Sequence, residues 1–219
     1  MGWTRTAAFA MGALALVIGA EAAEGGKPPA APGPIVEVKL EHGVVIQYPK
    51  GWVAADDQAR RKSIEKGVGA PGLTGMAARK ELASATLLNV QSDAHRFPAR
   101  LLVIDKTPPD VMESAVVNIA PETLVAATKQ ADAAFRSGLE LHGMKLLDYK
   151  PMERVSVAGR PALMTQAVQT TADGNLYVRQ YLIPTRANEY KFIFHLPVSE
   201  QTHWMPWMEH IVRTARIPD

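Results

Sequence analysis

Two neighbouring segments near the C-terminal end could together form one anion-binding surface. Tyr177, Arg179 and Tyr181 occupy alternate positions, so in a strand all three point to one side. His195 lies in the next expected strand, over residues 190–196, and pairing of the two strands would add it to the same cationic, aromatic surface. Arg179 would hold a carboxylate or phosphate through paired hydrogen bonds, and the tyrosines would supply flat contact area. The alternative is ordinary cross-strand pairing on an exposed face.

Two histidines and two methionines occur close together in the segment HWMPWMEH. Imidazole and thioether groups are both ligands that suit copper. At about 100° per residue, His203 and His210 share one side of a helix, whereas Met205 and Met208 lie nearly opposite. A regular helix therefore cannot bring all four to one ion, and the pattern favours a helix that packs Met208 into a core.

Other short motifs give no support for catalysis. Residues 67–72 match G-x-G-x-x-G, but a charged, helix-like stretch precedes them where a dinucleotide site needs a strand. G-x-S-x-G and H-E-x-x-H are both missing, and none of the six histidines is paired at metal-ligand spacing. Asp105 fits the end of a strand, and Asp56 with Asp57 fits the start of a helix. We predict no catalytic residue, no metal and no cofactor.

Hydrophobic patterns predict the elements that position these residues. A hairpin over residues 35–48 turns at His42 and Gly43. The clearest helix spans 121–141, and a last helix over 206–215 buries Met208, Ile211 and Val212. Further strands are expected at 99–105, 116–119, 144–149, 153–157, 162–171 and 176–183, and further helices at 56–66 and 76–88. Turns at Asp173-Gly174 and at 185–189 should join the last three strands. Antiparallel strands with segregated helices indicate an α+β fold, with an antiparallel sheet covered by helices.

The first 22 residues have the order of a secretory signal peptide. A short positive lead ends at Arg5, residues 6–20 carry no charge, and Ala20-Glu21-Ala22 fits the small-x-small cleavage pattern. The apolar run is shorter than the roughly 20 residues of a membrane-spanning helix, although an N-terminal anchor is the alternative. The predicted organisation is a signal peptide at 1–22, a Pro/Gly-rich linker at 23–34 and one globular domain at 35–219. No stable membrane span should remain after cleavage.

Composition narrows the class of protein further. The chain has 219 residues and a formal net charge of +2, so nothing indicates a nucleic-acid partner. It contains no cysteine, which excludes disulfides, thiol chemistry and a lipid-modified cysteine. An exported domain of this size without disulfides fits the bacterial periplasm better than eukaryotic secretion.

Three short segments form a characteristic set. They are the strand at 44–48 running into Pro49-Lys50-Gly51-Trp52, the turn Gly159-Arg160-Pro161, and an ending of paired strands, a helix and the tail Arg216-Ile217-Pro218. Together they resemble the PsbP/Mog1-like superfamily, as a bacterial exported member of it. The resemblance implies an α/β/α sandwich in which Trp52 is mostly buried. It also implies a binding role, and it brings no functional residues to this chain.

The sequence therefore favours an exported, non-enzymatic accessory or binding protein of the periplasm or cell envelope. Its expected partner is another envelope protein or a small anionic ligand. One alternative is a small-molecule or metal carrier that uses the face of Tyr177, Arg179 and Tyr181 or the histidine-methionine segment. The other is an uncharacterised hydrolase, in which the fold would have to bring a serine or aspartate to a histidine.

Overall fold

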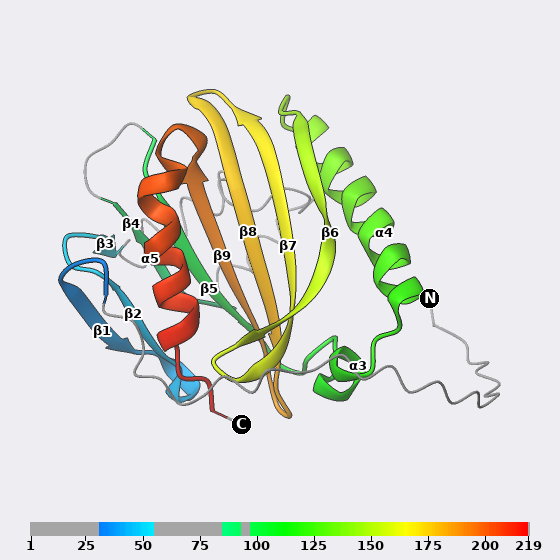
Figure 1. Ribbon diagram of the computed structural model, residues 1–219, viewed down its shortest axis with the longest axis horizontal. Helices are drawn as coiled ribbons and strands as arrows, with labels where there is room; N and C mark the ends of the chain where they lie inside the picture. The colour runs from blue at the N-terminus through cyan, green and yellow to red at the C-terminus, as the bar shows by residue number, and fades with distance from the viewer. Residues whose placement is uncertain (1–30, 55–84, 93–96, 219) are drawn as a thin grey trace.

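A computed structural model describes residues 31–54, 85–92 and 97–218, and it shows a large antiparallel sheet with helices on both faces (Figure 1). Seven strands have the order β3-β4-β5-β9-β8-β7-β6, and β1 pairs with β2 in a separate hairpin. The bounds are β1 Ile35–Lys39, β2 Val45–Pro49, β3 Val53–Ala54, β4 Thr86–Gln91, β5 Arg100–Lys106, β6 Leu146–Val157, β7 Arg160–Thr171, β8 Gly174–Pro184 and β9 Glu189–Pro197. The signal peptide, most of the linker, the helix at 56–66 and the glycine motif at 67–72, all predicted above, lie outside the described residues.

Three α-helices accompany the sheet in the described part of the chain. They are α3 Glu113–Val117, α4 Pro121–Glu140 and α5 Gln201–Thr214, together with the 3-10 turns η1 Glu41–Gly43 and η2 Val198–Glu200. Helix α4 begins at its proline, as predicted, because the missing N–H of Pro121 costs nothing in a first turn. Helix α5 begins earlier than predicted and contains Pro206, at the cost of one backbone hydrogen bond. No described helix combines the length and hydropathy of a membrane span.

The strand register divides the main sheet into two faces. Tyr181 pairs with Phe192 on the face covered by α5 and the hairpin, where both join the main core with Met208; we call this the α5 face. Ala167 pairs with Val178 on the opposite face, where Ala167 packs against Leu139 of α4; we call this the α4 face. Helices on both faces make the α/β/α sandwich that the sequence predicted (Figure 1).

The segments that carried the family resemblance meet at one end of the α5 face. After α5 the chain pairs with β2, since the backbone N–H of Val45 donates to the carbonyl oxygen of Arg216 at 2.9 Å and the reverse bond is 3.0 Å. Arg160, from the glycine-arginine-proline turn, donates its Nε to the carbonyl oxygen of Ile217 at 3.0 Å. Two motifs that lie far apart in the sequence therefore stabilise the same corner of the fold.

Some predicted elements are wrong. The strand expected at 116–119 is part of α3, where Val116 is fully buried and Val117 is exposed; such a short apolar run does not distinguish helix from strand. The helix expected at 76–88 is wrong at its end, because β4 begins at Thr86, and its start lies outside the described residues. The two strands expected at 144–157 form the single strand β6. Its Pro151 is tolerated because β6 is an edge strand.

The packing of the aromatic and apolar anchors is mostly as predicted. Met208 and Ile211 are buried against the sheet, and Val212 is partly buried at the edge of the same core. Trp52 is mostly buried, as expected, although it is not among the fully buried core residues. Its ring packs edge-on against Trp204 at a centroid distance of 5.5 Å.

We expect Met208→Ala to lower the free energy of unfolding by about 2–5 kcal/mol, because it leaves a cavity between α5 and the sheet. Urea denaturation of the purified protein measures this loss. The matched control is Met112→Ala, since Met112 is 53% exposed and its truncation should change stability by less than about 0.5 kcal/mol. Equal effects of the two substitutions would contradict the placement of α5.

Candidate functional site

Arg179 is the centre of a small polar cluster on the α5 face. Its Nε donates to the hydroxyl oxygen of Tyr177 at 2.6 Å, and its Nη2 donates to Oε1 of Gln166 at 3.1 Å. The Tyr177 hydroxyl donates to the same Gln166 oxygen at 2.7 Å, which closes a triangle of hydrogen bonds. A longer contact of 3.4 Å joins Nη1 to the hydroxyl of Tyr181. Three of the four predicted site residues are therefore brought together.

The cluster is more enclosed than the sequence suggested. Tyr177 and Tyr181 are buried in the main core, and the ring of Tyr181 packs edge-on against Phe194 at 6.1 Å. Arg179 is partly exposed, and its guanidinium lies 5.5 Å from the centre of the Tyr177 ring. The tyrosines therefore act as supports that orient the arginine, and of these three residues only the arginine offers an accessible polar group.

No carboxylate of the described residues forms an ion pair with Arg179, so its positive charge is held by neutral oxygens alone. Burial raises the pKa of the Tyr177 hydroxyl, and the Arg179 charge opposes this shift. Exposed Glu153 on β6 adds a weak upward effect on that pKa from the same face. The arrangement leaves Arg179 charged and able to accept an anion.

Sequence reasoning missed Gln166, which holds the guanidinium across the strand pair. The β7–β8 register places Gln166 directly opposite Arg179. The sequence predicts both strands, but the predicted turn at Asp173 and Gly174 is one residue late, since Thr171 pairs with Gly174. Placing the turn one residue earlier would have identified Gln166 as the partner.

The prediction that His195 shares the face of Arg179 is wrong. Arg179 pairs with Phe194, and His195 pairs with Val178, so the histidine lies on the α4 face. Side chains alternate along a strand, and a one-residue difference in register moves His195 to the other side of the sheet. There it lies opposite Arg100 of β5.

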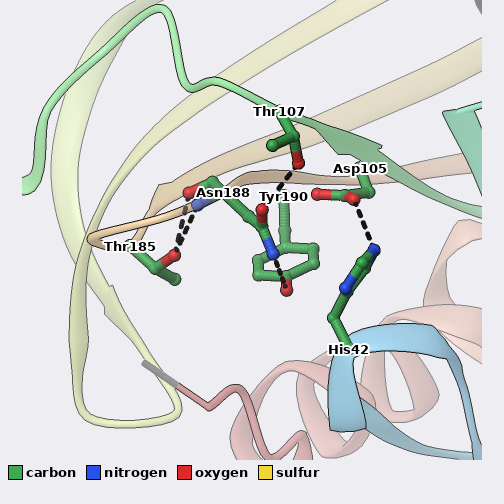
Figure 2. Close-up of polar contacts among 6 residues, drawn as sticks. All are labelled: His42, Asp105, Thr107, Thr185, Asn188 and Tyr190. Atoms are coloured by element: carbon green, nitrogen blue, oxygen red, sulfur yellow. Dashed lines mark hydrogen bonds and ion pairs between the residues drawn. The ribbon is translucent and has the colours of Figure 1, made fainter.

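The turn between β8 and β9 sets this register, and it forms a network that the sequence did not reveal (Figure 2). The backbone N–H of Thr185 donates to the Asn188 carbonyl oxygen at 2.7 Å, and the Asn188 N–H donates to the Thr185 hydroxyl at 3.0 Å. The Asn188 side chain donates to the Tyr190 hydroxyl at 2.8 Å and accepts a bond from the Thr107 hydroxyl at 2.6 Å. The turn is therefore fixed to the end of β5.

His42 and Asp105 extend the same corner toward the β1–β2 hairpin (Figure 2). The His42 Nε2 atom lies 3.2 Å from Oδ2 of Asp105, which is 8% exposed. Burial raises the pKa of Asp105, and the neighbouring His42 opposes this rise. A hydrolytic triad would need a hydroxyl bonded to the imidazole, but the Thr107 hydroxyl donates to Asn188 instead. The geometry supports a role in holding the hairpin against the sheet.

The histidines and methionines of α5 do not converge on one point. His203 is exposed, Met208 is 1% exposed in the core, and the Nε2 atom of His210 lies 3.2 Å from Oε1 of Gln47. Among the residues that the structure describes, no three His, Cys, Asp or Glu side chains come together as metal ligands would. The α5 geometry therefore gives no support to the metal-carrier alternative.

The buried His195 should make stability depend on pH. Burial, and then the Arg100 charge, lower its pKa from an ordinary 6.5 to about 3, so the folded protein holds it neutral. In the unfolded chain, His195 binds a proton below about pH 6.5. The free energy of unfolding that depends on neutral His195 is therefore at its full value above about pH 6.5, and it falls as the pH falls toward 3. We expect a loss of about 2–3 kcal/mol between about pH 7.5 and about pH 4.5.

Urea denaturation of the wild type and His195→Gln at both pH values isolates this loss from other titrating groups such as Asp105. The variant should lack the loss, whereas His142→Gln, which changes an exposed histidine, should keep it. The same pH dependence in the wild type and His195→Gln would show that His195 is not held neutral.

Comparison with known proteins supports the fold. No family model matches the chain, and no curated protein matches it significantly in sequence. The solution structure of cyanobacterial PsbP (CyanoP) from Synechocystis sp. PCC 6803 matches with a TM-score of 0.50 and 13% identity, covering 88% of this chain and 100% of that one.

Two further solved structures match at lower TM-scores. LpqN of Mycobacterium tuberculosis, which is involved in cell envelope biogenesis, is 12% identical with a TM-score of 0.46, covering 85% of this chain and 93% of its own. PA94 of Pseudomonas aeruginosa, a protein of unknown function and putative regulator, is 13% identical with a TM-score of 0.40, covering 85% and 99%. The sheet order, the helices on both faces and the match to CyanoP show that this chain has the PsbP/Mog1-like fold.

Proposed function

We propose that the protein is an exported, non-enzymatic accessory or binding protein of the periplasm or cell envelope. On this proposal, Arg179 receives an acidic group of a partner protein on the α5 face. The observation that carries the proposal is the charge of Arg179, which is partly buried and held by neutral oxygens alone in the described part of the chain.

A charge in this position favours an incoming anion for two reasons. Partial burial removes some of the water that would otherwise stabilise the guanidinium, so an anionic partner restores lost stabilisation. The bonds to Tyr177 and Gln166 also fix the orientation of the side chain before binding, which lowers the entropy lost when the complex forms. A surface lysine or arginine without such supports has neither advantage.

We expect Arg179→Gln to weaken binding of an envelope partner roughly 10- to 100-fold, the effect of losing one charge-assisted hydrogen bond of about 1.5–3 kcal/mol. Mature wild-type and variant proteins are immobilised and exposed to solubilised envelope proteins of the source bacterium, and the retained partner is quantified. Arg186→Gln is the matched control, because it removes the same charge from an exposed turn. Equal retention by both variants contradicts the proposal.

A second substitution, which removes a negative charge from the same face, makes this test more specific. Glu153 is exposed on the same face, so its carboxylate repels an acidic partner. Glu153→Gln should therefore strengthen retention of the partner that Arg179→Gln releases. Loss of the partner from both variants would mean that the charge of Arg179 does not attract it. Melting temperatures of all three variants, measured alongside, separate binding effects from unfolding.

Export is tested independently of the partner. Expressed in a bacterial host, the chain should be cut after Ala22, so that the mature protein begins at Ala23 and is found in the periplasmic fraction. Intact-mass measurement identifies the first residue, and fractionation with periplasmic and membrane markers gives the location. A full-length product in the membrane fraction would show that residues 1–22 act as an anchor.

A further inference from the structure

The α4 face carries a second arginine whose charge has no acidic partner among the described residues. Arg100 of β5 donates from Nη2 to Oε1 of Gln91 at 2.9 Å, and no carboxylate of the described residues forms an ion pair with it. Arg100 is partly exposed at the residue level, and burial of its guanidinium lowers its pKa. A desolvated guanidinium with one neutral acceptor is a poorly compensated charge.

Strand pairing surrounds this arginine with polar groups. Gln91, Arg100 and His195 are direct neighbours across β4, β5 and β9, so their side chains lie in one row on the α4 face. Asn89 lies two residues before Gln91 on the same face of β4 and is a diagonal neighbour of Arg100, at roughly 7–8 Å between backbones. Long side chains and a small molecule between them reach across such a distance.

Asn89 provides an independent sign of a missing ligand. Asn89 is 5% exposed, and its Oδ1 atom has no hydrogen-bond partner in the part of the chain that the structure describes. An unpaired buried amide oxygen typically costs about 1–3 kcal/mol, so such groups are rare unless something else binds to them. The oxygen needs a hydrogen-bond donor, whereas Arg100 needs an anion.

One class of molecule satisfies both requirements. We propose that the α4 face of β4, β5 and β9 binds a small organic carboxylate that also carries a hydroxyl or amino donor. Arg100 holds the carboxylate through its forked N–H groups, and Asn89 accepts the hydrogen bond from the donor. His195, buried beside Arg100 and neutral, lines the site, so the positive charge that attracts the carboxylate comes from Arg100. This site is on the opposite face from Arg179 and does not depend on the partner proposed for it.

The test uses the mature chain and three probes: 2-hydroxypropanoate, propanoate and inorganic phosphate. Binding is followed by nuclear magnetic resonance of the His195 ring and the Arg100 and Asn89 amides. The wild type should bind 2-hydroxypropanoate several-fold more tightly than propanoate, because only the former supplies a donor to Asn89. Phosphate should bind more weakly than 2-hydroxypropanoate if the site is built for a carboxylate with a neighbouring donor.

Three variants assign the roles of the residues. Arg100→Gln should weaken both carboxylates at least 10-fold, and Arg100→Lys, which keeps the charge without the fork, should weaken them less. Asn89→Leu should leave propanoate affinity unchanged and abolish the preference for 2-hydroxypropanoate. Arg179→Gln is the matched control and should bind all three probes as the wild type does, so failure of this proposal is distinguishable from failure of the partner proposal.

Several outcomes would overturn the proposal. They are resonances that do not move with any probe, equal affinity of the two carboxylates in the wild type, or an unchanged preference in Asn89→Leu. Phosphate binding that equals carboxylate binding would show an anion site without the donor recognition that we infer. If Arg100→Gln does not fold, undiminished binding by Arg100→Lys would likewise show that the fork is not used.

Discussion

The turn at Thr185–Asn188 is the constraint on which the polar architecture of this protein depends. Its internal hydrogen bonds close a loop of fixed length, and the Asn188 side chain ties that loop to Thr107 beyond β5 and to Tyr190 in β9. Because side chains alternate along a strand, the length of this loop decides which residues of β9 face α5 and which face α4. A loop one residue longer or shorter would exchange the two sets.

The register places Arg179 and Arg100 on opposite faces of the sheet. Arg179 lies on the α5 face with neutral oxygens around it, and Arg100 lies on the α4 face beside a neutral histidine. The two charges are kept on opposite sides of the sheet, where each can attract an anion separately. Had the register placed His195 opposite Arg179, the two residues would have shared one surface, as the sequence alone suggested.

The sequence predicted most of the strands and the helices α4 and α5, because each has a clear period of apolar residues. It did not predict register, which depends on turn geometry that a period of two cannot show. The turn before Gly174 was placed one residue late, which hid Gln166. The β8–β9 turn was expected to end at Glu189, but Glu189 already pairs with Pro184, which put His195 on the wrong face. Asn89 was missed because β4 was expected to be the end of a helix.

A fold shared at 13% identity constrains the core but not the chemistry. The core positions of this sheet, such as Phe192 and Phe194, are explained by packing alone. Arg179 and Arg100 interrupt that apolar pattern on partly exposed positions, and neither is explained by an ion pair within the described residues. Positions that break the local rule without an internal compensation are where function is expected. For this chain, the partly exposed arginines on the two faces of the sheet are therefore better indicators of binding than the fold itself.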